Sequence, residues 1–439
     1  MTTYTSYTTA QIAAMVEVDF TGSGFLSPAD VAAFSTSQIA ALTTQQINGW
    51  MTLSQLGALT TSQISQGLST AQVASLNTAQ AQALTVQQLA QSFTTAQIAA
   101  LATAGMAALS VTQVSALSTA QVVAITTAQA GALTNLQISS GLSEAQVAAL
   151  ETADLSAIGT AQIYRLTASQ IAALTTAQVY ALNASQVAAL SPAQVGAFSA
   201  TQIAQGFSTA AIANLSVDGL SGLTVAQVAQ GLTTDQMVAL STTQVASLSS
   251  ALVSQGLSTA QVAAMETRDI AVLSLSAVAA LTAAQLSDGL STAQVRAITA
   301  AQFAALTPAQ FINLTTTQVA QGFSTAQIVA LTTAQAASLS TAQVAQGLTT
   351  AQIAVMETAD IAALSLANIS ALTTDQVQSG LSTAQITALT GTQIAQAVTT
   401  VQISALATSQ VVALTTAQVA QLSGSQISAR FSTAQVRAM

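Results

Sequence analysis

One apolar residue recurs every eight or nine positions along nearly the whole chain, with mostly small and polar residues between its occurrences. These anchor residues run from Leu26 through Phe34, Leu42 and Met51 to Met439 without a break in register. A unit counted from each anchor to the next gives thirty-seven units of eight residues and thirteen of nine. A short period kept over such a length predicts one continuous repeat array.

Each unit also carries the polar signature of a helix start. Its usual order is anchor, Ser or Thr, a variable residue, Ala, Gln, Val or Ile, Ala, and a variable residue. Ser or Thr followed three residues later by Gln is a capping box, in which both side chains satisfy free N–H groups at the start of a helix. The anchor and the Val or Ile at position six then form a hydrophobic staple. We expect a capped helix of about one and a half to two turns in each unit.

Proline and glycine positions agree with this frame. Pro28, Pro192 and Pro308 all stand at the third position of a unit, which is the first helical residue and favours proline. In nine of the thirteen longer units the extra residue is glycine, and we expect each to sit as a C′ residue just past a helix end. These glycines are Gly67, Gly141, Gly206, Gly231, Gly256, Gly289, Gly322, Gly347 and Gly380.

The pattern predicts an all-α solenoid of very short helices, with a β-solenoid as the alternative. One continuous helix would rotate successive units by about 80°, so its apolar stripe would not stay on one face. A β-solenoid needs apolar positions of equal parity, whereas the anchor and the Val or Ile are an odd number of residues apart. Helices this short are unstable alone, so neighbouring units must bury their apolar faces together. The longer units recur most often after 25 or 33 residues, which suggests a turn of three to four units.

The segment before the array differs, and we expect residues 1–33 to be an N-terminal segment and residues 34–439 a continuous solenoid. Residues 19–30 resemble an EF-hand or dockerin calcium loop, with oxygen-bearing residues at alternate positions and Gly24 at the sharp turn. An Asp replaces the usual Glu at position twelve, which implies weak affinity for calcium. The alternative is a plain glycine turn into the first capped helix. The candidate calcium ligands are Asp19, Thr21, Ser23, Phe25 (through its main chain), Ser27 and Asp30.

Composition excludes several classes of function. The chain has five basic and fourteen acidic residues, a net charge of −9, and no Lys, His or Cys. It therefore lacks the basic surface that nucleic acids and anionic lipids require. No apolar run approaches the ~20 residues of a membrane span, so we expect no membrane insertion. The usual pairs of nucleophile and base cannot be assembled, and we expect no enzyme.

Three units replace both polar signature residues by acids. A carboxylate pair at this spacing suggests acid–base chemistry or metal binding, or else caps a helix start, where the helix dipole favours negative charge. We favour the helix-start interpretation. The pairs are Glu151 with Asp154, Glu266 with Asp269, and Glu357 with Asp360.

Two resemblances to known families follow from these units. Residues 190–198 and 306–314 resemble the first helix of transcription-activator-like effector repeats, but the second helix, the base-reading pair and the basic residues of that family are missing, so no DNA binding is implied. The array as a whole resembles large bacterial surface or secreted proteins rich in Ala, Thr and Gln. This resemblance implies an extracellular or cell-surface location.

These observations favour a structural function. A large surface with few charges gives a monomer low solubility. The array stops at Met439 on an anchor, without the polar capping unit that solenoids need. We expect a rod or a self-assembling extracellular filament or surface layer, formed by head-to-tail stacking of copies. The alternative is an adhesin stalk or surface-binding module that contacts glycans or ice.

Overall fold

The computed structural model describes residues 4–22, 25–428 and 435. Every regular element among these residues is a short helix, and none is a strand. The predicted all-α solenoid is confirmed, and the β-solenoid alternative is wrong because the capping boxes hold each unit in helical conformation. The chain divides into two compact units, residues 1–223 and residues 224–439, and each is described by itself.

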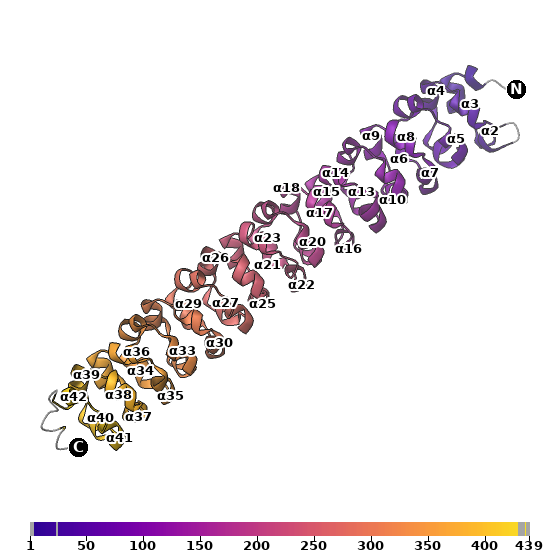
Figure 1. Ribbon diagram of the computed structural model, residues 1–439. Helices are drawn as coiled ribbons and strands as arrows, with labels where there is room; N and C mark the ends of the chain where they lie inside the picture. Colours follow the sequence, from indigo (N-terminus) through magenta and orange to yellow (C-terminus); the bar gives the residue numbers. More distant parts are fainter. Residues whose placement is uncertain (1–3, 23–24, 429–434, 436–439) are drawn as a thin grey trace. The chain divides into compact units, whose positions relative to one another are not determined.

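The first unit contains one 3₁₀ helix, twenty-two α-helices and four π-helical turns among its described residues (Figure 1). They are η1 (Tyr4–Ser6), α1 (Thr9–Ala13), α2 (Glu17–Thr21), α3 (Pro28–Ala32), α4 (Thr36–Ala41), η2 (Gln46–Trp50), α5 (Leu53–Gly57), η3 (Gln63–Gly67), α6 (Thr70–Ala74), α7 (Thr78–Ala83), α8 (Val86–Gln91), α9 (Thr95–Ala100), α10 (Thr103–Ala108), α11 (Val111–Ser115), α12 (Thr119–Val123), α13 (Thr127–Ala132), η4 (Gln137–Gly141), α14 (Glu144–Ala149), α15 (Thr152–Ala157), α16 (Thr160–Ile163), α17 (Ala168–Ala173), α18 (Thr176–Tyr180), α19 (Ala184–Ala188), α20 (Pro192–Ala197), η5 (Gln202–Gly206), α21 (Thr209–Asn214) and α22 (Val217–Leu220).

The second unit continues the series with twenty α-helices and five π-helical turns among its described residues. They are α23 (Val225–Gln230), α24 (Thr234–Val238), α25 (Thr242–Ala246), η6 (Leu252–Gly256), α26 (Thr259–Ala264), α27 (Thr267–Val272), α28 (Leu275–Val278), η7 (Gln285–Gly289), α29 (Thr292–Ala297), α30 (Ala300–Ala305), α31 (Pro308–Phe311), η8 (Gln318–Gly322), α32 (Thr325–Val329), α33 (Thr333–Ser338), η9 (Gln343–Gly347), α34 (Thr350–Val355), α35 (Thr358–Ala363), α36 (Leu366–Ala371), η10 (Gln376–Gly380), α37 (Thr383–Ala388), α38 (Gly391–Gln396), α39 (Thr400–Ala405), α40 (Thr408–Val412), α41 (Thr416–Val419) and α42 (Gly424–Ser428).

The helices start where the sequence predicts. In α9, the Thr94 hydroxyl oxygen accepts a hydrogen bond from Gln97 N–H at 3.2 Å, and Gln97 Oε1 accepts one from Thr94 N–H at 2.8 Å. Both halves of this capping box recur in most units. Pro28, Pro192 and Pro308 each stand at the first residue of a helix, as expected. Local sequence therefore fixes where each short helix begins.

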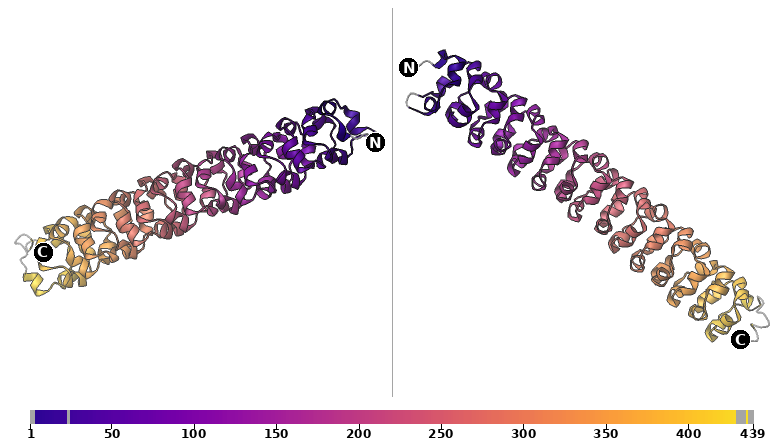
Figure 2. Two further views of the ribbon diagram at one scale, coloured as in Figure 1. Left: turned by 90° about the horizontal axis from the view of Figure 1, so that it is seen from above. Right: turned by 180° about the vertical axis from the view of Figure 1, so that it is seen from behind.

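The short helices wind into coils of three repeat units. In the first unit α6 contacts α9, and α7 contacts α10, which in turn contacts α13. In the second unit α26 contacts η7, and α29 contacts η8. Each pair lies three repeat units apart, so every helix packs beside its counterpart in the next coil, as the ribbons of Figures 1 and 2 show within each unit. The sequence suggested three to four repeat units per turn of the solenoid, and the structure has three.

The core of each coil consists of the anchors and the Val or Ile residues at position six. Ile64 and Ile98 are completely buried, and the anchors Leu68 and Leu101 are nearly so. Each helix of one to two turns therefore buries two large apolar side chains. Burial of such a side chain contributes about 1.5–3 kcal/mol, which offsets the unfavourable nucleation of so short a helix.

The prediction that the glycines of the longer units lie just past a helix end is wrong for eight of the nine, which are the last residues of π-helical turns, whereas Gly231 directly follows α23. In η3, Gly67 is the last helical residue rather than a left-handed C′ residue, and Leu68 N–H donates to Gln63 O, five residues back, at 2.9 Å. Glycine is suited to this place because the coils approach closely there. A Cβ atom on Gly206 would lie 2.7 Å from Val179 Cβ, in the preceding coil. The extra residue thus widens the helix into a π-turn instead of ending it.

Candidate functional site

The first half of the 19–30 loop includes the last three residues of α2, and one of them caps the start of that helix. Asp19 and Thr21 lie in α2, where Asp19 Oδ2 accepts a hydrogen bond from Val16 N–H at 2.8 Å. The Thr21 hydroxyl donates to Glu17 O at 3.1 Å. One carboxylate oxygen of Asp19 is therefore already used to cap this helix.

The second half of the loop forms another helix start. Asp30 Oδ2 accepts hydrogen bonds from Ser27 N–H at 2.9 Å and from the Ser27 hydroxyl at 2.6 Å. These two bonds hold the pKa of Asp30 below its ordinary value. The loop closes through Leu26 N–H, which donates to Asp19 O at 2.9 Å, and Phe25 N–H donates to Gly22 O at 3.2 Å.

The oxygen atoms of this loop fit the alternative interpretation better, in which the loop is a plain turn into a capped helix. Each of the two carboxylates spends an oxygen on N–H groups, which leaves few free oxygens for a cation. Ser23 lies outside the described residues. No group of three or more His, Cys, Asp or Glu side chains gathers anywhere in the described part of the chain. Calcium binding by this loop stays a prediction.

The second arrangement is one that the sequence did not predict, a row of buried glutamine amides that joins successive coils. Gln97 is 3% exposed, and while its Oε1 caps α9, its Nε2 donates to Ile64 O at 2.6 Å and Leu68 O at 2.8 Å. In the second unit, Gln318 Nε2 donates to Leu286 O and Leu290 O, both at 2.7 Å. In each case one acceptor carbonyl belongs to the position-six residue within a helix, and the other belongs to the anchor that follows this helix.

We call this row the amide ladder, defined by the position-five glutamines whose Nε2 donates to carbonyls of the preceding coil. Both ends of each amide are satisfied, as a buried polar group requires. A capping box accepts Glu as readily as Gln, so the strong preference for Gln is the sequence signal that a donor is needed here. Clear members are Gln46, Gln63, Gln72, Gln97, Gln121, Gln137, Gln170, Gln186, Gln261, Gln285, Gln318, Gln343, Gln376, Gln385, Gln410 and Gln426.

The three acidic pairs interrupt the amide ladder. Asp154, Asp269 and Asp360 take the position of the glutamine and are at most 2% exposed. In each, one buried carboxylate oxygen has no hydrogen-bond partner. The partner acids Glu151 and Glu357 stand at the cap position without accepting a cap hydrogen bond through their side chains. The prediction that these pairs act as caps is therefore wrong for the two glutamates.

Burial dominates the acid–base behaviour of these aspartates. It raises the pKa of Asp360 to about 6, and the nearby Glu357 carboxylate adds to the rise. Burial also raises the pKa of Asp154, although a hydrogen bond from Thr127 opposes part of the effect. For Asp269, burial again raises the pKa against the hydrogen bond from Glu266 N–H and the Arg268 guanidinium. A carboxylate that lacks donors in a buried site is costly to keep ionised.

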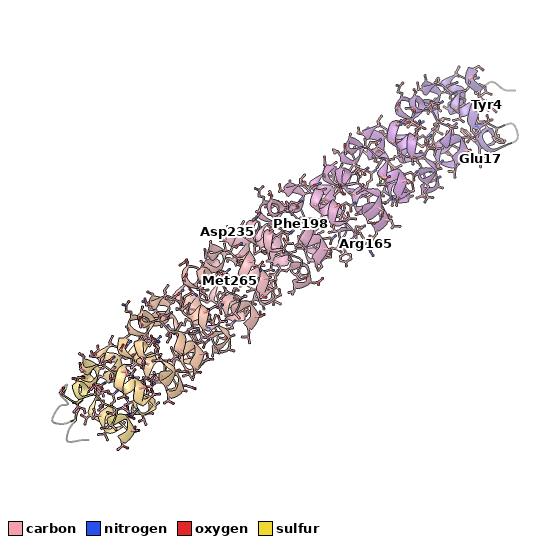
Figure 3. The ribbon with its side chains drawn as sticks, in the orientation of Figure 1. Tyr4, Glu17, Arg165, Phe198, Asp235 and Met265 are labelled. Carbon is pink, nitrogen blue, oxygen red and sulfur yellow. The ribbon has the colours of Figure 1, made fainter. Side chains whose placement is uncertain are left out.

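In the repeat units that the structure describes, most other charged side chains lie at the surface. Glu17, Arg165 and Asp235 are exposed, whereas the anchors Phe198 and Met265 are buried (Figure 3). No helix in the described ranges is both long enough and apolar enough to cross a membrane.

The chain matches a known family model in four stretches. The model of the ALTTAQ repeat matches residues 98–135, 147–184, 288–316 and 353–391. These stretches contain the capped units and coil-joining glutamines described above, and they identify the chain as a repeat protein similar to that family. No curated protein matches the chain.

Proposed function

We propose that the chain is a structural repeat protein that builds extracellular filaments or a surface layer by stacking copies head to tail. The observation that supports this proposal is the uniformity of the coil interface. In either unit a coil presents amide donors to the coil before it and carbonyl acceptors to the coil after it, as Gln97 donates to Ile64 O while Ile98 O accepts from Gln129. A coil of a second copy offers the same complementary groups.

The geometry of the contact favours an open polymer. A donor face that meets an acceptor face is a heterologous contact, and such contacts form filaments when they do not close into rings. The few charges of the chain weaken electrostatic repulsion between copies.

Electron microscopy and sedimentation velocity over a concentration series test this proposal. We expect filaments or sheets whose length grows with protein concentration. Short monodisperse monomers at every concentration would contradict it.

A second candidate is a surface-binding module, such as an adhesin stalk that contacts glycans or ice. Its support is the exposed threonine at the first helical residue of many units, as at Thr70, Thr78 and Thr95. Thermal hysteresis measures ice binding and a glycan array measures glycan binding, so one of the two should be positive if this candidate is right, and two negative results would contradict it.

We also propose that the 19–30 loop binds calcium weakly. Few free carboxylate oxygens suit dissociation constants of about 10⁻⁴–10⁻³ M, the range of extracellular calcium modules. Calcium titration by calorimetry, with Asp30→Asn as the comparison, should show one such site that the variant loses.

A further inference from the structure

The three buried aspartates depart from the pattern that most of the coil interface follows. At position five, a glutamine amide donates across the joint between coils, as Gln352 does to Val319 O at 2.9 Å and Phe323 O at 3.2 Å. An ionised aspartate at this position only accepts hydrogen bonds, and the groups opposite are carbonyls, which also only accept. Asp360, one unit further along, has an unpartnered oxygen in this setting.

A neighbouring unit shows that a shorter side chain can still bridge the joint. Asn368 stands at position five of the unit after Asp360, and its side chain has the length of aspartate. Its Nδ2 donates to Leu339 O at 2.8 Å. Length therefore does not stop Asp360 from reaching the preceding coil, where the corresponding carbonyls are those of Ile328 and Leu331. What Asp360 lacks is a proton to donate.

We propose that Asp154, Asp269 and Asp360 are acid-strengthened joints, at which protonation supplies the missing donor and tightens the contact between two coils. At neutral pH each joint holds a buried carboxylate against main-chain carbonyls, and the coils there open more readily. Mild acid removes this repulsion.

Asp360 gives the cleanest case because its surroundings carry little other charge. Glu357, on its own helix α35, is the nearby carboxylate. The helices α33 and α37, which pack against α35, contain no ionisable side chain. The pH dependence of the contact between these two coils is therefore determined mainly by the protonation of Asp360.

The other two joints have more charged neighbours. Near Asp154 are Glu151, which is the N-cap residue of α15, and Tyr180 on α18, while α13 has no ionisable side chain. Asp269 has Glu266 and Arg268 on α27, none on α25, and Arg296 on α29. Arg268 Nε lies 3.8 Å from Asp269 Oδ1 and favours its ionised form. We therefore expect the effect of pH on the opening of the coils to be weakest at Asp269.

The sign of the pH effect follows from the direction of the pKa shift. Asp360 has a pKa of about 6 in the folded chain, against about 3.9 for an unfolded aspartate. Between these values the folded state binds more protons, so stability is highest below the lower value and is lost as the pH rises through the higher one.

Hydrogen exchange measured by mass spectrometry, corrected for intrinsic rates, tests the proposal on the full chain. In the wild type we expect the opening of residues 356–364 to rise about tenfold from pH 5 to pH 7.5. In Asp360→Asn the amide supplies a permanent donor, so opening should stay low at both pH values. An Asp360→Asn chain that keeps the wild-type pH response would overturn the proposal.

The reverse variant gives an independent check. Asn368→Asp should acquire the same pH response in residues 364–372, with thermal unfolding at lower temperature at pH 7.5 than at pH 5. Opening that is independent of pH in this variant would show that solvent satisfies an ionised carboxylate at the joint, and the proposal would fail.

Discussion

Gln97 has both ends of its side-chain amide in use, and this double use explains why glutamine recurs in the array. Its oxygen caps its own helix, and its nitrogen bonds to two carbonyls in the coil before it. Glutamate could do the first and not the second. Glutamine thus connects local helix formation to the stacking of coils.

Gln97→Glu should destabilise the chain by about 3–5 kcal/mol, because it leaves a buried charge facing two acceptors. Chemical denaturation monitored by circular dichroism measures the loss. Gln11→Glu is the matched control, since Gln11 caps α1 in the same way but is exposed. An equal effect of the two substitutions would contradict the role given to the amide ladder.

Gly206→Ala should also destabilise the chain, by about 1–3 kcal/mol, because the added methyl group overlaps Val179 in the preceding coil. Gly57→Ala is the control, since nothing lies within 4 Å of the position of its Cβ. That change should be neutral or stabilise the helix by about 0.5–1 kcal/mol. The unfolding temperatures of both variants should be measured. A loss in Gly206→Ala alone shows the effect of close contact between coils, because both variants gain the same helix propensity.

At the scale of the element, the sequence predicted the helix starts of the repeat units but not those of η1 and α2 in the N-terminal segment, as the capping boxes and the three prolines show. It did not predict how the longer units end. A π-turn such as η3 and a C′ glycine have the same local sequence, and only the distance to the next coil distinguishes them. The same limit hid the amide ladder, because position five looks like part of a capping box until the preceding coil is in place.

Ala407→Ser should stabilise α40 by about 0.5–1 kcal/mol. Ala407 stands at the cap, where its N–H donates to Gln410 Oε1 at 2.7 Å but its side chain accepts nothing. A serine hydroxyl would accept a hydrogen bond from Gln410 N–H, which at present donates only to Ala407 O at 2.9 Å, and would complete the capping box. Thermal unfolding measures the gain, and Thr408→Ala, at an exposed position of the same helix, controls for a general effect of hydroxyl groups. No gain in Ala407→Ser would count against the importance of the cap.

At the scale of the whole molecule, each of the two compact units is stabilised by many repeated contacts rather than by one central core. A helix of five or six residues contributes two buried apolar side chains, two cap bonds and two or three amide bonds to the preceding coil. None of these suffices alone, and each is repeated along the array. The fold class and the repeat could be predicted from sequence because they depend on contacts inside one unit. The coil-to-coil bonds could not, because they join residues about thirty positions apart.

The amide ladder is tested most directly by exchange of the glutamine side-chain protons. The chain can be labelled with ¹⁵N at glutamine Nε2 and transferred to D₂O, and the loss of the side-chain signals can be followed by NMR. We predict that most of these amide protons exchange as slowly as the buried main-chain amides, while those of Gln11 exchange at once. Rapid exchange of all glutamine side chains, with the helices still intact by circular dichroism, would contradict the account.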